Sequence, residues 1–152
     1  MKNLHKNNHF VKNIGRKVCS FIFNSETAIK SIETVYIFGS VLDEKNFKHS
    51  SDIDIAFLVD KSMYKQDPLK ASTDSYLIST QIGLSLDRQT DVIILNSTSI
   101  ETTFQIISTG MVIYENNSEK RIEYEIAMKG LYYDFKPFLD TLRSKAMTEL
   151  NQ

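Results

Sequence analysis

Cysteine is almost absent from the sequence, since Cys19 is the only one among 152 residues. A lone thiol cannot close a disulfide within the chain, and its place among apolar helix positions favours a buried small side chain over a nucleophile. Long apolar runs are missing too, because none approaches the roughly 18 residues that a membrane span requires. Residues 1–10 also lack the apolar segment of a signal peptide, so we expect a cytoplasmic protein that does not contact a membrane.

Charge of one sign is not in excess either. The 18 basic and 19 acidic side chains leave a net charge of −1, which gives no general attraction to nucleic acid. Five basic residues precede the first acidic one, Glu26, but such a run is typical of the solvated face of a helix. His5, His9 and His49 do not have a metal-ligand spacing. Nucleic acid is therefore not expected as a direct substrate.

Internal repeats, low-complexity segments and linkers are not found, so residues 1–152 are expected to form one domain. Apolar residues instead alternate between helical and strand periodicity. Helical spacing covers residues from about 8 to 32, 68 to 84, 98 to 109 and 118 to 150, with an interruption or kink near Pro137. Strand-like runs cover residues 34–38, 52–59, 90–95 and, more weakly, 111–114. This order predicts an α/β (α+β) fold, in which helices pack on a small mixed sheet of three to four strands.

The helix that begins near residue 68 has a clear start. Asp67 is a favourable N-cap, and Pro68 suits the first helical position. The larger apolar and threonine side chains of this helix recur on one mostly apolar stripe: Leu69, Thr73, Tyr76, Leu77, Thr80 and Leu84.

Two aspartates, Asp52 and Asp54, lie in the otherwise apolar strand DIDIAFLV. Residues two apart on a strand point to the same face, with Cα atoms roughly 6.5–7 Å apart. Their charges repel, and partial burial raises the free energy of ionising both. A divalent cation resolves this conflict, because hard carboxylate oxygens suit Mg²⁺. Ile53, Ile55 and Phe57 point the other way and can enter the core.

A third aspartate, Asp91, is the second residue of the next predicted strand, TDVIIL. If that strand lies beside residues 52–59, Asp91 joins the same cluster, with Ile93 on its own face of the sheet and Val92 on the opposite one. Three carboxylates from two strands could hold a pair of Mg²⁺ ions ~3.5–4 Å apart, the arrangement that clamps both oxygens in a phosphoryl displacement. Each aspartate alone would indicate only a solvated strand end or turn.

Gly39 and Ser40 end the strand of residues 34–38. Glycine lets the backbone approach a ligand closely, and a serine hydroxyl with neighbouring N–H groups can hold a phosphate. By itself such a pair indicates only a turn. Its position 12 residues before Asp52 leaves a loop long enough to fold back and bring a triphosphate to the metals.

Together these residues resemble the signature of the DNA polymerase β-like nucleotidyltransferase superfamily: Phe38-Gly39-Ser40, a short loop, Ser51-Asp52-Ile53-Asp54-Ile55, and Thr90-Asp91-Val92. The small size points within it to the minimal nucleotidyltransferase (MNT) antitoxins that are paired with HEPN-type toxins. The specific motifs span Phe38 to Leu95, and the order of elements extends the similarity over nearly the whole chain. Gly110–Tyr114 and the aromatic segment Tyr132–Pro137 are less specific points of likeness.

The loop after Ser40 departs from the superfamily pattern. That pattern usually has ten residues before the first aspartate, often beginning with a turn that contains arginine and glycine. Here eleven residues intervene, Val41 to Ser51, and none is glycine or arginine. One extra loop residue is tolerated sterically. A phosphate contact from a loop arginine is not expected, and Lys45 or Lys48 would have to replace it.

The resemblance implies a role for each site residue. Gly39 and Ser40 would bind the β- and γ-phosphates of a nucleoside triphosphate, which is ATP by analogy. Asp52 and Asp54 would ligate both Mg²⁺ ions, and Asp91 would ligate the catalytic ion and help to deprotonate the acceptor hydroxyl. Transfer would then depend mainly on positioning and charge neutralisation.

Three functions fit this pattern. The resemblance implies an antitoxin that transfers AMP from ATP to a tyrosine hydroxyl of a cognate HEPN ribonuclease toxin and so neutralises it. The alternatives are a small-molecule (aminoglycoside-type) nucleotidyltransferase, for whose additional acceptor-binding domain 152 residues leave no room, and a non-catalytic antitoxin that acts by binding alone. Five aromatic residues could either contact a partner or complete the protein's own core: Tyr124, Tyr132, Tyr133, Phe135 and Phe138.

Overall fold

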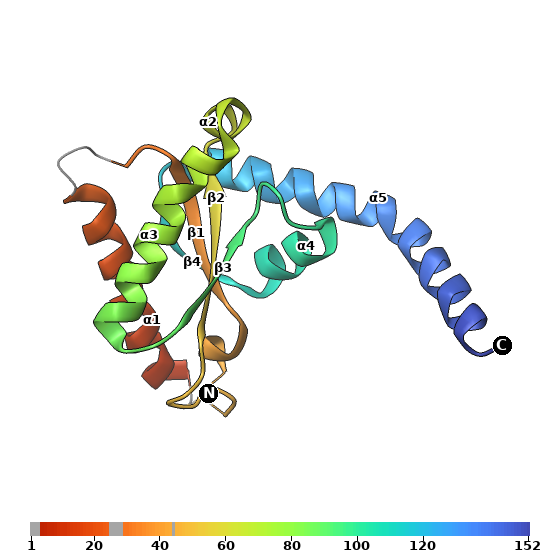
Figure 1. Ribbon diagram of the computed structural model, residues 1–152, viewed down its shortest axis with the longest axis horizontal. Coiled ribbons are helices and arrows are strands. Elements are labelled where there is room, and N and C mark those ends of the chain that lie inside the picture. Colours follow the sequence, from red (N-terminus) through yellow and green to blue (C-terminus); the bar gives the residue numbers. More distant parts are fainter. Residues whose placement is uncertain (1–3, 25–28, 44) are drawn as a thin grey trace.

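The computed structural model describes residues 4–24, 29–43 and 45–152 (Figure 1). At its centre is a four-stranded mixed sheet in the order β3-β2-β1-β4, in which β1 is antiparallel to β2 and β4, and β2 is parallel to β3. The strands are β1 (Ile32–Phe38), β2 (Ile53–Val59), β3 (Thr90–Ile94) and β4 (Met111–Glu115). The helices are α1 (Leu4–Phe23), the 3₁₀ turn η1 (Gly39–Leu42), α2 (Lys61–Gln66), α3 (Pro68–Leu86), α4 (Ile100–Thr109) and α5 (Ser118–Leu150). The predicted fold class is confirmed.

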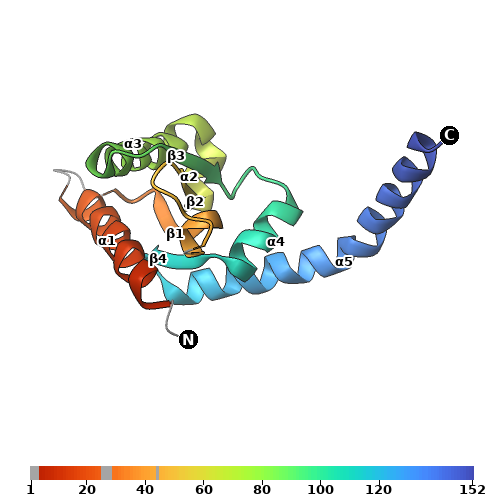
Figure 2. The ribbon, with the colours of Figure 1, turned by 90° about the horizontal axis from the view of Figure 1, so that it is seen from below.

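Helices cover both faces of the sheet. α1 and α3 lie on one face, and α4 and the first half of α5 lie on the other (Figures 1 and 2). Successive side chains of β2 point to opposite faces of the sheet, so the strand contributes to the cores on both faces. Ile53, Ile55 and Phe57 are buried in the core that includes α1 and α3. Ala56 packs with Tyr36 in the second core, together with α4. Asp54, which lies on the same face of β2 as Ala56, therefore belongs to the α4 side of the sheet.

The first helix is shorter than predicted. Helical spacing indicated residues from about 8 to 32, but α1 ends at Phe23, and Ile32 is already the first residue of β1, paired with Val59. β-Branched residues such as Ile32 and Thr34 pack well on a sheet, and both are buried there. Residues 25–28, which include part of the predicted helix, lie outside the described residues. Cys19 is partly buried against the core.

The start of α3 is confirmed. The Asp67 side chain accepts a hydrogen bond from the backbone N–H of Lys70 at 3.0 Å, and Pro68 is the first helical residue. The face of α3 that packs on the sheet is lined mainly by small residues: Ala71, Ser72, Ser75, Ile78, Ser79, Ile82 and Gly83. These small side chains let α3 pack close to the sheet. Ser79 Oγ accordingly donates a hydrogen bond to Thr90 Oγ1 of β3 at 2.7 Å. The larger residues of the predicted stripe are consequently turned to solvent.

The last helix, α5, packs on the body of the molecule along its first half, and in its far half Arg143 donates to Glu101 of α4. Tyr132 stacks on Phe104 of α4, with ring centroids 3.8 Å apart. Tyr36 donates to Glu125 at 2.8 Å and so fastens α5 to β1. The helix is continuous, but it bends and its far half projects from the body (Figure 2). Pro137 lies inside it, and a proline there removes one helical hydrogen bond and bends the helix, as predicted.

Three of the aromatic residues of α5, Tyr133, Phe135 and Phe138, are exposed. Tyr124, by contrast, packs against the core around Tyr36. The five C-terminal aromatic residues are therefore divided between the protein's own core and its surface. None of the helices in the described parts of the chain combines the length and the apolar character that a membrane crossing needs.

Candidate active site

Three aspartates meet at one end of the sheet, where β2 and β3 begin. Asp54 is directly paired with Asp91 in the parallel register of these strands, and Asp52 is the residue immediately before β2. Asp52 and Asp54 are half-buried, whereas Asp91 is exposed. The structure therefore places the two predicted strands side by side, which the predicted cluster requires.

The surroundings of Asp54 disfavour its charged form. Burial raises the pKa of Asp54 above its usual value, and the negative charges of Asp91 and then Asp52 raise it further. Within the described residues, no group of three or more acidic, histidine or cysteine side chains is arranged so that it could hold a metal ion by itself. Mg²⁺ commonly takes only one or two carboxylates and completes its shell with water and substrate phosphates.

Gly39 lies directly against Asp54. Its φ is +75°, a left-handed conformation that glycine adopts without strain, and a Cβ built there would overlap the Oδ2 atom of Asp54 and lie 3.1 Å from its Cγ. The neighbour on β1, Phe38, is paired with Asp54 across the sheet. Ser40 is half-buried in the turn that follows, and its carbonyl oxygen accepts the backbone N–H of Asp43 at 2.9 Å. The Gly-Ser turn and the carboxylates thus form one continuous surface.

The loop between Ser40 and Asp52 is held by an arginine that the sequence analysis did not single out. Nη1 of Arg88 donates to the carbonyl oxygens of Lys48 and Ser51, both at 2.9 Å. Its guanidinium also lies 4.4 Å from the ring centroid of Phe47 and 5.5 Å from that of Phe10. Because Ser51 directly precedes Asp52, Arg88 fixes the strand end that carries the first carboxylate.

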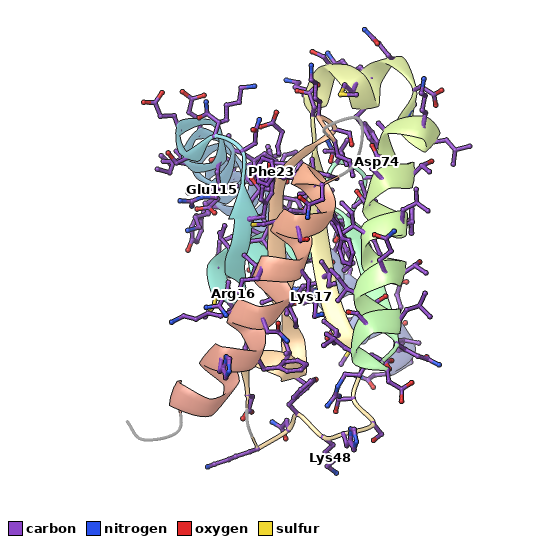
Figure 3. All side chains as sticks on the ribbon, turned by 90° about the vertical axis from the view of Figure 1, so that its left-hand side faces the viewer. Arg16, Lys17, Phe23, Lys48, Asp74 and Glu115 are labelled. Atoms are coloured by element: carbon purple, nitrogen blue, oxygen red, sulfur yellow. The ribbon has the colours of Figure 1, made fainter. Side chains whose placement is uncertain are left out.

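The lysines that might replace a loop arginine are both exposed. Lys48 lies at the turn of the loop, at the bottom of Figure 3, and offers its backbone carbonyl to Arg88. Lys45 is exposed as well. No local pattern in the sequence marks Arg88, since its partners lie 37 and 40 residues away.

Comparison with known families decides the class of the protein. Residues 20–119 match the family model described as polymerase beta, nucleotidyltransferase. The chain belongs to this nucleotidyltransferase family. The matched range contains the whole sheet, the Gly-Ser turn and all three aspartates. α5 lies almost entirely beyond it.

The nucleotidyltransferase also shares its fold with toxin–antitoxin proteins of known structure. A toxin–antitoxin structure with AMP-PNP has a TM-score of 0.64 at 17% identity, and the alignment covers 88% of this chain and 98% of that one. The complex of a tri-AMPylated Shewanella oneidensis HEPN toxin with its MNT antitoxin has a TM-score of 0.62 at 17% identity, with 90% and 98% covered. An MntA–HepT toxin–antitoxin structure has a TM-score of 0.60 at 16% identity, with 89% and 97% covered. Among curated proteins, no match is found.

Proposed function

We propose that this nucleotidyltransferase is an MNT-type antitoxin, which transfers AMP from ATP to a tyrosine hydroxyl of a HEPN-type toxin in a Mg²⁺-dependent reaction. The observation that carries the proposal is the cluster of Asp52, Asp54 and Asp91 beside a glycine turn in a nucleotidyltransferase fold. The likeness to a complex that contains an AMPylated HEPN toxin supports the choice of acceptor.

The proposal assigns a role to each site residue. Asp52 and Asp54 would hold two Mg²⁺ ions, together with Asp91, and the ions would neutralise charge on the triphosphate during transfer. Asp91 is the most exposed of the three, so its carboxylate is accessible to an acceptor hydroxyl and can accept its proton. Gly39 leaves room for the Asp54 carboxylate against the turn. Gly39 and Ser40 would bind the β- and γ-phosphates, to which the Ser40 hydroxyl can donate.

A protein acceptor also agrees with the surface of α5. Its projecting half carries several exposed apolar side chains, among them Phe135, Phe138 and Leu142. Aromatic side chains are enriched in the buried centres of protein interfaces. A toxin held there would bring its own tyrosine to the carboxylates, without an acceptor-binding domain in this chain.

Intact mass spectrometry of the partner protein tests the proposal. The protein encoded beside this chain is incubated with it, ATP and Mg²⁺, and each transfer is expected to add the mass of one AMP unit. Asp52→Asn/Asp54→Asn is the control variant, and it should leave the partner unmodified. A partner that binds both forms equally but never gains mass would indicate an antitoxin that acts by binding alone. Turnover of ATP with a small-molecule acceptor, and no complex, would indicate the small-molecule enzyme.

A further inference from the structure

The outward face of α3 carries an apolar stripe that nothing in the described structure covers. The exposed fractions are 81% for Leu69, 52% for Tyr76, 56% for Leu77 and 79% for Leu84. Thr73 and Thr80 lie between them on the same face and are also exposed. No residue of this stripe is charged, although a solvated helix face normally carries charged side chains. Such a face indicates a binding surface.

The residue types of the stripe are arranged almost symmetrically about its centre. Its sequence is Leu-x₃-Thr-x₂-Tyr-Leu-x₂-Thr-x₃-Leu, so reversal about the point between Tyr76 and Leu77 exchanges Leu69 with Leu84 and leaves the pattern intact apart from that central pair. In a two-fold symmetric interface residue i of one copy contacts residue j of the other, and j contacts i, so an axis at this point places leucine against leucine and threonine against threonine. We infer that α3 packs antiparallel on α3 of a second copy of this chain, about a two-fold axis between Tyr76 and Leu77.

Both threonine hydroxyls of the stripe would keep a hydrogen-bond partner if the stripe were buried in an interface. Thr73 Oγ1 donates to the carbonyl oxygen of Leu69 at 2.9 Å, and Thr80 Oγ1 donates to that of Tyr76 at 2.8 Å. A buried polar group without a partner would cost ~1–3 kcal/mol, and both threonines avoid this by bonding within their own helix. Each can therefore lose its water on association without losing its hydrogen bond.

The shape of the surface also fits the antiparallel arrangement. The surface is hollowed at the Leu84 end, where the lining includes Thr80 and Arg88. The projecting Leu69 of the second copy lies opposite this hollow.

The area is sufficient for a weak specific dimer. Three leucines and a tyrosine, exposed by half to four-fifths, offer on the order of 500 Å² per copy, so a dimer would bury about 1,000 Å², the lower limit for a specific interface. α3 and α4 lie on opposite faces of the sheet, and Figure 3 shows the outer side of α3 free of other elements. Two copies joined through α3 would keep their carboxylates and α5 accessible.

Sedimentation of the full-length chain tests this inference and needs no catalysis. The wild-type protein is expected to sediment at twice the mass of one chain in the micromolar range. In the double variant Thr73→Lys/Thr80→Lys, the lysine at position 73 of each copy faces the lysine at position 80 of the other copy. The dimer should weaken at least about tenfold, because like charges across an interface repel. Thr73→Glu/Thr80→Lys places glutamate opposite lysine twice, and should retain a dimer that weakens with salt. The two positions are seven residues, roughly 10.5 Å, apart on one helix and do not pair within a chain.

Three results would overturn the inference. They are a monomeric wild-type chain throughout the micromolar range, a Lys/Lys variant that dimerises as well as wild type, and a Glu/Lys variant that dissociates as completely as Lys/Lys. Circular dichroism checks that both variants fold. Hydrogen exchange adds an independent test, because α3 should be protected in the chain alone. Protection that appears only when the proposed toxin is added would assign this face to the toxin instead.

Discussion

Ionised Asp54 destabilises the folded chain when no cation is present. Its pKa is raised by burial and by the charges of Asp91 and Asp52, so the folded chain binds this proton more tightly than the unfolded chain does. The contribution of Asp54 to stability is therefore present at low pH and is lost as the pH rises through its folded-state pKa. We expect Asp54→Asn to raise the Tm of the chain in chelator at neutral pH, and the difference from wild type to shrink as the pH falls towards about 4.

Asp60→Asn is the matched control for this prediction, since Asp60 follows the other end of β2 and caps α2 by accepting the N–H of Met63 at 2.9 Å. Asparagine caps a helix about as well as aspartate, so its Tm should not change. Mg²⁺ with ATP should raise the Tm of wild type but not of Asp54→Asn. A lower Tm for Asp54→Asn in chelator would contradict the prediction.

Gly39 permits a contact that no other residue allows. Gly39→Ala would force a methyl group onto the Asp54 carboxylate and would also strain the backbone at φ +75°. We expect it to lower the free energy of unfolding by about 1–3 kcal/mol and to lower nucleotide transfer more than tenfold. Gly130→Ala is the control, because a Cβ there meets nothing within 4 Å, and alanine should stabilise α5 by ~0.5–1 kcal/mol. Equal effects of the two substitutions in urea melts would argue against the contact.

Among the connecting elements, the loop that ends at Ser51 is held by Arg88, and Phe10 of α1 also packs on Phe47 of this loop. Arg88→Ala would free the carbonyl oxygens of Lys48 and Ser51 and remove the guanidinium from the Phe47 ring. We expect faster hydrogen exchange in the loop and a fall of about tenfold in kcat, because a small misplacement of Asp52 is enough to slow transfer. Arg88→Lys should not restore the rate, since lysine lacks the planar fork of donors.

Lys48→Ala separates the two roles that the loop could have. It removes the charge but keeps the carbonyl that Arg88 binds, so we expect nearly wild-type transfer. A loss of activity in Lys48→Ala alone would show that its side chain acts on the substrate.

The elements differ in how far the sequence determines them. Strands β2 and β3 were predictable, because alternation around Asp54 and Asp91 is a local pattern with a period of two. The end of α1 was not predictable from the sequence. Ile32 fits the helical spacing, but it joins β1, where it pairs with Val59, which is 27 residues away in the sequence. The role of Arg88 was hidden for the same reason, as its partners are distant in sequence. On α3, small residues such as Ala71 and Gly83 pack best on the sheet, and the larger side chains were left outside.

For the molecule as a whole, stability and the projecting part of α5 should be separable. Residues 144–152 are all exposed, so their deletion should change the Tm by no more than about 2 °C, as is usual for surface changes. A longer deletion that begins at Tyr124 would uncover the core around Tyr36 and should unfold the chain. Thermal melts of the two truncations measure this difference. Equal Tm losses would show that the far half of α5 supports the fold.

The repulsion among Asp52, Asp54 and Asp91 also bears on how long the protein survives in a cell. A chain that is least stable when its carboxylates are bare opens more often, and proteases cut the open form. Nucleotide and metal would shift this balance simply by occupying the end of the sheet. The lifetime of the protein would then follow the supply of its own substrate, with starvation acting as a signal for its removal.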